Sequence, residues 1–129
     1  MAGTDKTQEI SYRPSPAIIL CEPQLGENIG TTARAMANFG LWDLRLVNPR
    51  DGWPNERAVA AASRADHVIS KVRVFETTEA AIADLSLVLA TTARRRDLQK
   101  PVFGPEEASQ RLATHIAGGA GAGLLFGRE

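Results

Sequence analysis

Short apolar runs that alternate with helix-like segments constrain the fold of this chain more than any other feature. The runs are unbroken, as in Ala17-Ile18-Ile19-Leu20-Cys21 and Leu87-Val88-Leu89-Ala90, which is typical of strands covered on both faces. Strands that alternate with helices predict an α/β fold, a parallel sheet flanked by helices on both faces. The strand-like segments are 17–21, 44–47, 68–69 together with 72–75, 87–90 and 124–126, and the helical segments are 31–38, 55–65, 77–85 and 105–117.

The length and composition fit one folded domain. The chain has 129 residues, of which 43% are hydrophobic, enough to build a core. Residues 1–16 are polar and end in Arg13-Pro14-Ser15-Pro16, so we expect a flexible leader followed by a domain over 17–129. The 15 basic and 15 acidic residues give a net charge of zero, which argues against a broadly basic nucleic-acid binder but allows a local basic patch.

The sequence points to a cytoplasmic protein. It has no apolar stretch of the roughly 18 residues that a membrane span needs, and its first residues do not resemble a signal peptide. The single cysteine, Cys21, excludes an internal disulfide and fits a buried small apolar residue. His67 and His115 show no metal-ligand spacing, so no metal site is expected.

The first candidate motif is Asn28-Ile29-Gly30-Thr31-Thr32-Ala33-Arg34, which follows the first strand. A helix that begins there would offer free N–H groups and a positive dipole end to a phosphate. Arg34 would lie in the first or second turn of a helix over 31–38, where a cation opposes the dipole; this hints at function, and a solvated surface arginine is the alternative. The spacing matches neither a Walker loop nor a dinucleotide-binding fingerprint.

Two further motifs follow strands. The second motif, Thr91-Thr92-Ala93-Arg94-Arg95-Arg96-Asp97, comes after the strand 87–90. Its small residues would let a ligand approach the backbone, and its three arginines could bind RNA phosphates, in a patch that could include Arg45, Arg50 and Arg57. A solvated charged loop is the alternative. Phe126-Gly127-Arg128-Glu129 follows the last strand and is uninformative by itself.

In this order and spacing, the three motifs resemble the SpoU branch of the SPOUT RNA ribose methyltransferases, and within it the TrmJ type, which methylates tRNA. The resemblance covers residues 17–129 and includes Leu46-Val47-Asn48-Pro49. It implies an α/β domain with a C-terminal trefoil knot, S-adenosylmethionine as cofactor, a homodimer, and methylation of a cytidine or uridine ribose 2′-hydroxyl in the tRNA anticodon loop.

The resemblance also implies roles for individual residues. Asn28 and Arg34 would belong to the catalytic motif. Residues that line the cofactor pocket would be Thr91, Thr92, Ala93 and Gly127, and those that bind RNA would be Arg94, Arg95 and Arg96. Because a guanidinium stays protonated, we expect Arg34 to clamp a phosphate and to stabilise the developing alkoxide rather than to act as a base.

The chain departs from the family pattern after Glu129, where relatives continue through Gly-Leu, Asn-Glu and Ser-Leu-Asn segments. We therefore expect an incomplete knot and an inactive polypeptide when these 129 residues stand alone. Two alternatives stay open: a TrmH-like guanosine methyltransferase acting on tRNA or rRNA, and a non-catalytic RNA-binding α/β module. An unrelated receiver-like domain would need clustered acidic residues after the first strand, where only Glu22 and Glu27 occur.

Overall fold

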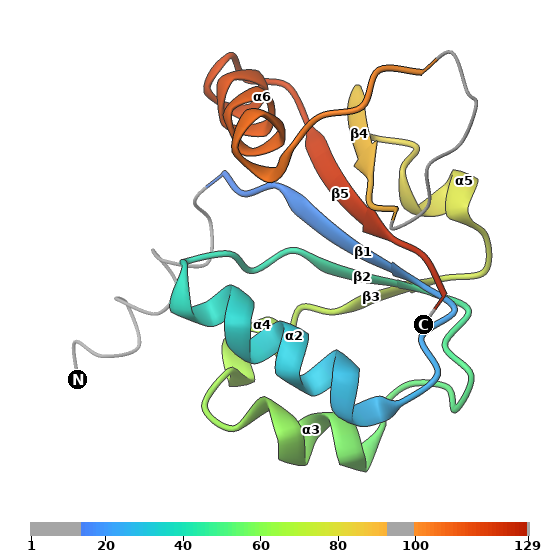
Figure 1. Ribbon diagram of the computed structural model, residues 1–129. Coiled ribbons are helices and arrows are strands. Elements are labelled where there is room, and N and C mark those ends of the chain that lie inside the picture. Colours follow the sequence, from blue (N-terminus) through green and yellow to red (C-terminus); the bar gives the residue numbers. More distant parts are fainter. Residues whose placement is uncertain (1–13, 93–99, 129) are drawn as a thin grey trace.

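The computed structural model describes residues 14–92 and 100–128 and contains one five-stranded parallel sheet (Figure 1). Of the predicted leader, residues 1–13 lie outside the described part. The strands, in sequence order, are β1 (Ala17–Cys21), β2 (Leu44–Val47), β3 (Arg73–Phe75), β4 (Leu87–Ala90) and β5 (Ala122–Phe126). Their order in space is β3-β2-β1-β5-β4, with β1 at the centre between β2 and β5.

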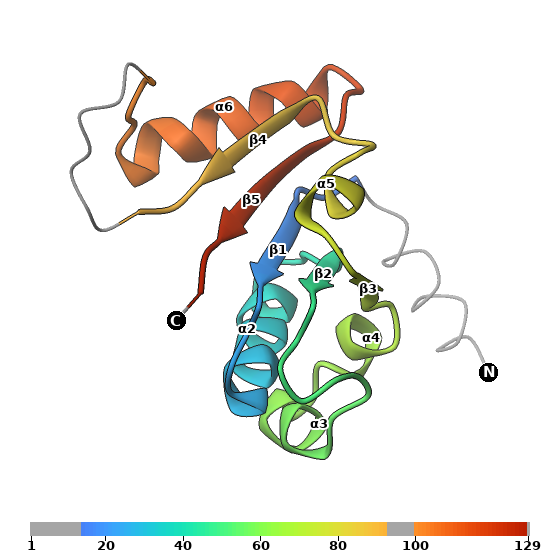
Figure 2. The same ribbon diagram turned by 90° about the vertical axis from the view of Figure 1, so that its right-hand side faces the viewer.

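Helices cover both faces of the sheet, as predicted. The helices are α2 (Gly26–Asn38), α3 (Glu56–Ala62), α4 (Asp66–Ile69), α5 (Thr78–Ala81) and α6 (Pro105–Ala117). Figures 1 and 2 show α2, α3, α4 and α6 on one face, while the short α5 lies on the other. This division follows from right-handed crossovers, because the connection from β3 to β4 runs across the sheet in the opposite direction to the rest.

The core is divided by the sheet into a larger and a smaller cluster. On the α2 face, Ile18, Leu44 and Leu46 of the sheet pack with residues of α2 such as Ile29 and Met36. On the α5 face, the buried cluster is small and consists of Ala17, Ile19, Val47 and Ala81. The larger core therefore fixes α2, the helix that follows the central strand.

The α2 helix begins five residues earlier than the sequence predicted, at Gly26 instead of Thr31. Two glycines within this stretch argue against a helix by intrinsic propensity. Both are required by packing: a Cβ at Gly30 would lie 2.2 Å from the carbonyl oxygen of Ala58, and a Cβ at Gly26 would lie 2.6 Å from Oδ1 of Asn55. The close approach of α3 thus outweighs local propensity.

Other differences concern short elements. The predicted strand at Val68-Ile69 is wrong, since these residues belong to α4, where Val68 is fully buried. The helix predicted over 55–65 ends at Ala62, because Ser63 takes a left-handed φ of 57°. The helix predicted over 77–85 spans only Thr78–Ala81. Its N-cap is Thr77, whose side chain accepts a hydrogen bond from the Ala80 N–H.

Candidate functional site

A pocket of about 230 Å³ lies at the carboxyl ends of β1 and β5. Ligands of open parallel sheets bind at this edge. The residues that line it are Leu20, Cys21, Pro23, Asn28, Thr32, Phe126 and Gly127. The fold thereby brings the first motif, in α2, next to the third motif, at the end of β5.

The polar groups of the pocket come from the start of α2. Asn28 and Thr32 are one turn apart, so they lie on the same side of the helix. The Thr32 hydroxyl donates a 2.7 Å hydrogen bond to the carbonyl oxygen of Asn28, and the Thr31 hydroxyl donates to the same atom at 3.2 Å. The Asn28 side chain is exposed at the edge of a pocket whose other walls are largely apolar.

Arg34 is not among the residues that line this pocket. The prediction that it lies in the first or second turn is wrong, because it is the ninth residue of α2 and lies in the third turn. It therefore lies about 9 Å along the helix axis from Asn28 and about a third of a turn around it. Arg34 is thus too far from the helix start to oppose the dipole, and the hint of function from that effect no longer applies. Arg34 is exposed and makes no hydrogen bond or ion pair with any residue of 14–92 or 100–128.

The second motif begins beside the pocket strands. The backbone N–H of Thr91 donates to the carbonyl oxygen of Leu125 at 2.9 Å, and its hydroxyl reaches the same oxygen at 3.4 Å. Thr91 is therefore attached to β5 one residue before Phe126, and both Thr91 and Thr92 are exposed. Ala93, Arg94, Arg95 and Arg96 lie outside the described residues.

An ion pair joins the residues that follow the two pocket strands. Nη2 of Arg128 lies 3.3 Å from Oε1 of Glu22, and both side chains are mostly exposed. Glu22 adopts a left-handed φ of 49°. Sequence reasoning did not select Glu22, Pro23 or Thr32 as site residues. The available signals were the position of Glu22 directly after β1 and the spacing of four residues between Asn28 and Thr32.

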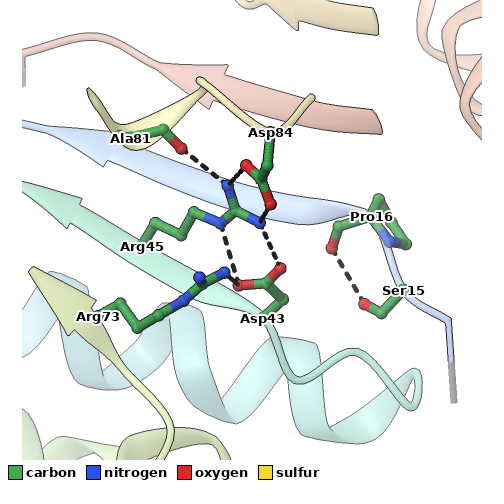
Figure 3. A network of polar contacts seen from close by, with 7 residues as sticks. All are labelled: Ser15, Pro16, Asp43, Arg45, Arg73, Ala81 and Asp84. Carbon is green, nitrogen blue, oxygen red and sulfur yellow. Dashed lines mark hydrogen bonds and ion pairs between the residues drawn. The ribbon is translucent and has the colours of Figure 1, made fainter. Parts of the chain in front are cut away.

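Arg45 does not belong to a surface basic patch, in contrast to the sequence-based suggestion. It is 3% exposed and points into the α5 face (Figure 3). Its guanidinium donates to Asp43 at 3.2 and 2.9 Å, to Asp84 at 2.6 and 3.1 Å, and to the carbonyl oxygen of Ala81 at 2.8 Å. Arg73 adds a 3.3 Å contact to Asp43.

This network explains the charge states of its members. Burial by itself lowers the pKa of Arg45, but its hydrogen bonds with Asp43 and Asp84 outweigh that effect and raise the pKa above the ordinary value. The hydrogen bond from Arg45 also lowers the pKa of Asp84. A permanently charged, fully paired guanidinium is a structural element that fixes α5, and it has no donor left for RNA.

Residues 14–92 and 100–128 contain no group of three or more His, Cys, Asp or Glu side chains that could hold a metal ion. Over the same residues, none of the helices has the length and apolar character needed to cross a membrane.

The chain is similar to known proteins. Residues 15–129 match the sequence profile described as the SpoU rRNA Methylase family. The chain is 38% identical over 112 residues to the tRNA (cytidine/uridine/adenosine-2'-O-)-methyltransferase TrmJ of Pseudomonas aeruginosa, covering 87% of this chain and 43% of the relative. It is 42% identical over the same length to the tRNA (cytidine/uridine-2'-O-)-methyltransferase TrmJ of Yersinia pestis, with the same coverage.

Solved structures agree with the sequence relatives. The crystal structure of TrmJ from Z. mobilis ZM4 superposes with a TM-score of 0.83 at 58% identity, covering 88% of this chain and 50% of that one. A probable methylase family protein from Haemophilus influenzae superposes with a TM-score of 0.78 at 34% identity, covering 88% of this chain and 46% of that one. The chain thus spans about half the length or less of these four proteins, and it belongs to the SpoU rRNA Methylase family.

Proposed function

We propose that the protein containing this chain is a tRNA ribose 2′-O-methyltransferase, which transfers a methyl group from S-adenosylmethionine to the 2′-hydroxyl of a cytidine or uridine in the anticodon loop. The observation that carries the proposal is the pocket in which Asn28 and Thr32 of α2 meet Phe126 and Gly127 of the β5 end. Relatives named as tRNA cytidine/uridine 2′-O-methyltransferases align with the chain over 87% of its length. We place the reaction in the cytoplasm, where tRNA is modified.

The described pocket fits one part of such a cofactor. Its volume of about 230 Å³ is below the roughly 300–1,000 Å³ of typical small-molecule sites. Its largely apolar walls, with an amide and a hydroxyl, suit a flat uncharged group such as the adenine ring of that cofactor. We propose that Gly127, Thr91, Thr92 and Ala93 hold the cofactor, which supplies an electrophilic methyl group on a sulfonium sulfur.

Arg34 and Asn28 are proposed to act on the RNA ribose. A ribose 2′-hydroxyl is a weak nucleophile, so the protein must orient it and stabilise the negative charge that develops on its oxygen. Arg34 carries a permanent positive charge and is exposed, without a described partner. We assign to it a clamp on the adjacent phosphate and electrostatic stabilisation, and to Asn28 a hydrogen bond that orients the ribose.

The remaining partners follow from the same proposal. Arg94, Arg95 and Arg96 would contact phosphates of the tRNA, because guanidinium groups bind phosphate in a bidentate manner. The complete protein would act as a homodimer. No membrane or metal partner is proposed.

The test is a methylation assay on the complete protein with unmodified tRNA transcripts and S-adenosylmethionine, followed by nucleoside mass spectrometry. We expect 2′-O-methylcytidine or 2′-O-methyluridine. Methylated guanosine alone would replace the proposal with the guanosine methyltransferase. Salt-dependent tRNA binding without any methylation would favour the non-catalytic RNA-binding module.

Arg34→Ala in the same protein tests the assignment of roles. We expect methylation to fall by about 100-fold or more, as when a preorganised charge is removed from a reaction centre. Cofactor affinity, measured by calorimetry, should stay nearly unchanged because Arg34 does not line the pocket. Loss of cofactor binding together with activity would contradict the assigned role.

A further inference from the structure

The ion pair between Glu22 and Arg128 occupies a specific place relative to the pocket. Glu22 directly follows Cys21, and Arg128 directly follows Gly127; both of these preceding residues line the pocket. The ladder between β1 and β5 ends at the pair Leu20 and Phe126. Beyond that last pair, the 3.3 Å contact between the two side chains joins the two strand ends again.

A contribution to folding stability does not explain this ion pair. The Glu22 and Arg128 side chains are 51% and 67% exposed, and ion pairs that remain hydrated contribute little to folding. The backbone of Glu22 has a φ of 49°, a conformation that disfavours residues with a Cβ. Strained residues of this kind concentrate at functional sites, where the surrounding structure holds them in place.

The surroundings of Glu22 do hold it in place. Its N–H donates to the carbonyl oxygen of Val47 at 2.8 Å, which attaches it to the end of β2. Its own carbonyl oxygen accepts a 2.9 Å hydrogen bond from the side-chain amide of Gln24. The backbone position from which the Glu22 side chain extends is therefore fixed. Gly127 is not held in this way, because it has no side chain and open space lies around its Cα.

We propose that Glu22 and Arg128 are positioning residues, whose ion pair holds the Gly127-Arg128 segment against the end of β1 and keeps the pocket in its binding shape. The proposal rests on the proposed function, because it takes Gly127 as part of the cofactor site. The pair acts by preorganisation: a segment that is already ordered loses less conformational freedom when the ligand binds.

The test uses the complete protein with Glu22→Gln, Arg128→Gln and the exchanged double variant E22R/R128E. The matched control is the Glu107–Arg111 pair on α6, which is similarly exposed at 54% and 52% and has a 3.0 Å contact outside the pocket. Two quantities are measured: the Kd for S-adenosylmethionine by calorimetry, and hydrogen exchange of the backbone amides of 126–128 without ligand. Thermal unfolding checks that each variant is folded.

We expect each single variant at the pocket to weaken cofactor binding by about tenfold, to speed amide exchange at 126–128, and to unfold at nearly the wild-type temperature. The double variant should restore most of the cofactor affinity and most of the protection of amides 126–128 from exchange. Glu107→Gln and Arg111→Gln should change neither the affinity nor the exchange rates. Normal exchange and normal binding in the single variants would overturn the proposal. So would loss of binding that the exchanged pair fails to rescue, because the side chains would then act separately.

Failure of the proposed function would give a different pattern. Wild-type protein that does not bind S-adenosylmethionine would remove that function, while the exchange rates of 126–128 would still decide whether the pair orders this segment. Unchanged exchange in Glu22→Gln would then refute the positioning role independently of any ligand.

Discussion

Arg45 illustrates how one buried charge can organise a whole face of the sheet. Each of its five N–H donors has an acceptor, supplied by two carboxylates and one carbonyl oxygen. Two of these acceptors, Ala81 and Asp84, belong to α5 and the turn that follows it. A helix of only four residues has little stability of its own, so its position depends on this guanidinium. The planar fork of donors is the property that lysine cannot replace.

We therefore predict that Arg45→Lys lowers the free energy of unfolding by about 2–4 kcal/mol, because the carboxylates lose most of their partners while staying in place. Urea denaturation measures the change. The exposed Arg111→Lys, whose pair lies on α6, is the control and should stay within about 0.5 kcal/mol of wild type. An equally small effect at Arg45 would mean that the network does not stabilise α5.

The same network predicts a dependence of stability on pH. The hydrogen bond from Arg45 lowers the pKa of Asp84 in the folded state. A carboxyl group whose folded pKa lies below its unfolded value of about 3.9 contributes stability that is fully present above that value. This contribution is lost as the pH falls through the lower, folded pKa.

Asp84→Asn should accordingly be less stable than wild type near neutral pH, and the difference should shrink as the pH falls below about 4. Urea denaturation of both proteins between pH 3 and pH 7 checks this. A difference that is constant over the whole range would show that the charge of Asp84 is not what stabilises the contact.

At the scale of elements, the contact between α2 and α3 determines where the site residues of α2 can lie. Gly30 faces α3 so closely that a Cβ would come within 2.2 Å of a backbone oxygen and 2.7 Å of the Ala61 Cβ. Asn55 adds to this contact, since its side chain caps α3 by accepting from the N–H groups of Arg57 and Ala58. The glycine of the motif, Gly30, therefore serves packing between helices.

Gly30→Ala is predicted to lower the free energy of unfolding by about 2–3 kcal/mol, because backbone atoms of α3 must move to admit the methyl group. Chemical denaturation measures this loss. Gly118→Ala is the matched control: its φ is −77° and an added Cβ would meet only ordinary contacts at 3.4 Å or more. Equal effects at both positions would show that the α2–α3 contact is looser than described.

The elements that the sequence predicted best are those whose apolar runs are buried in the sheet. The residues of β1, β2 and β4 match the predicted segments 17–21, 44–47 and 87–90. The start of α2 was missed because Gly26 and Gly30 are explained only by the approach of α3, a distant part of the sequence. Val68-Ile69 was missed because two adjacent apolar residues fit a buried strand and a buried helix equally well.

The candidate site was predictable to a similar extent. The sequence placed three motifs at the ends of strands, and the fold unites Asn28 with Phe126 and Gly127 in one pocket. It could not show that Arg45 is buried, since exposure of an arginine depends on acceptors such as Asp43 and Asp84 in other elements. The roles assigned to Arg34 and to the arginines at 94–96 stay predictions.

At the scale of the whole molecule, the strands of the sheet differ in how deeply they are buried. The strands β1 and β2 are covered by α2, α3 and α4 around the larger cluster, whereas Arg73 and Val74 of the edge strand β3 are exposed. At the opposite edge of the sheet, Leu87, Val88 and Leu89 of β4 are only partly buried. Since local stability follows burial, β1 and β2 with the larger core should form the most stable part of the sheet.

Native-state hydrogen exchange should reveal this difference. We predict that the amides of β1 and β2 exchange only through global unfolding, while those of β4 exchange faster through local opening, by about tenfold or more. Measurement at several low denaturant concentrations separates the two routes. Uniform exchange across all five strands would show that the sheet opens as a single unit.

The pairing of Ile18 with Leu124 has a consequence for the order of events during synthesis. A ribosome releases β1, α2 and β2 well before β5, at about 5–20 residues per second. The unit with the larger core can therefore assemble first, with one edge of its innermost strand still open. The pocket forms only when β5 fills that edge, so the binding site matures after the unit with the larger core. Until then, the open edge of β1 is a place where a chaperone, or another nascent chain, can bind.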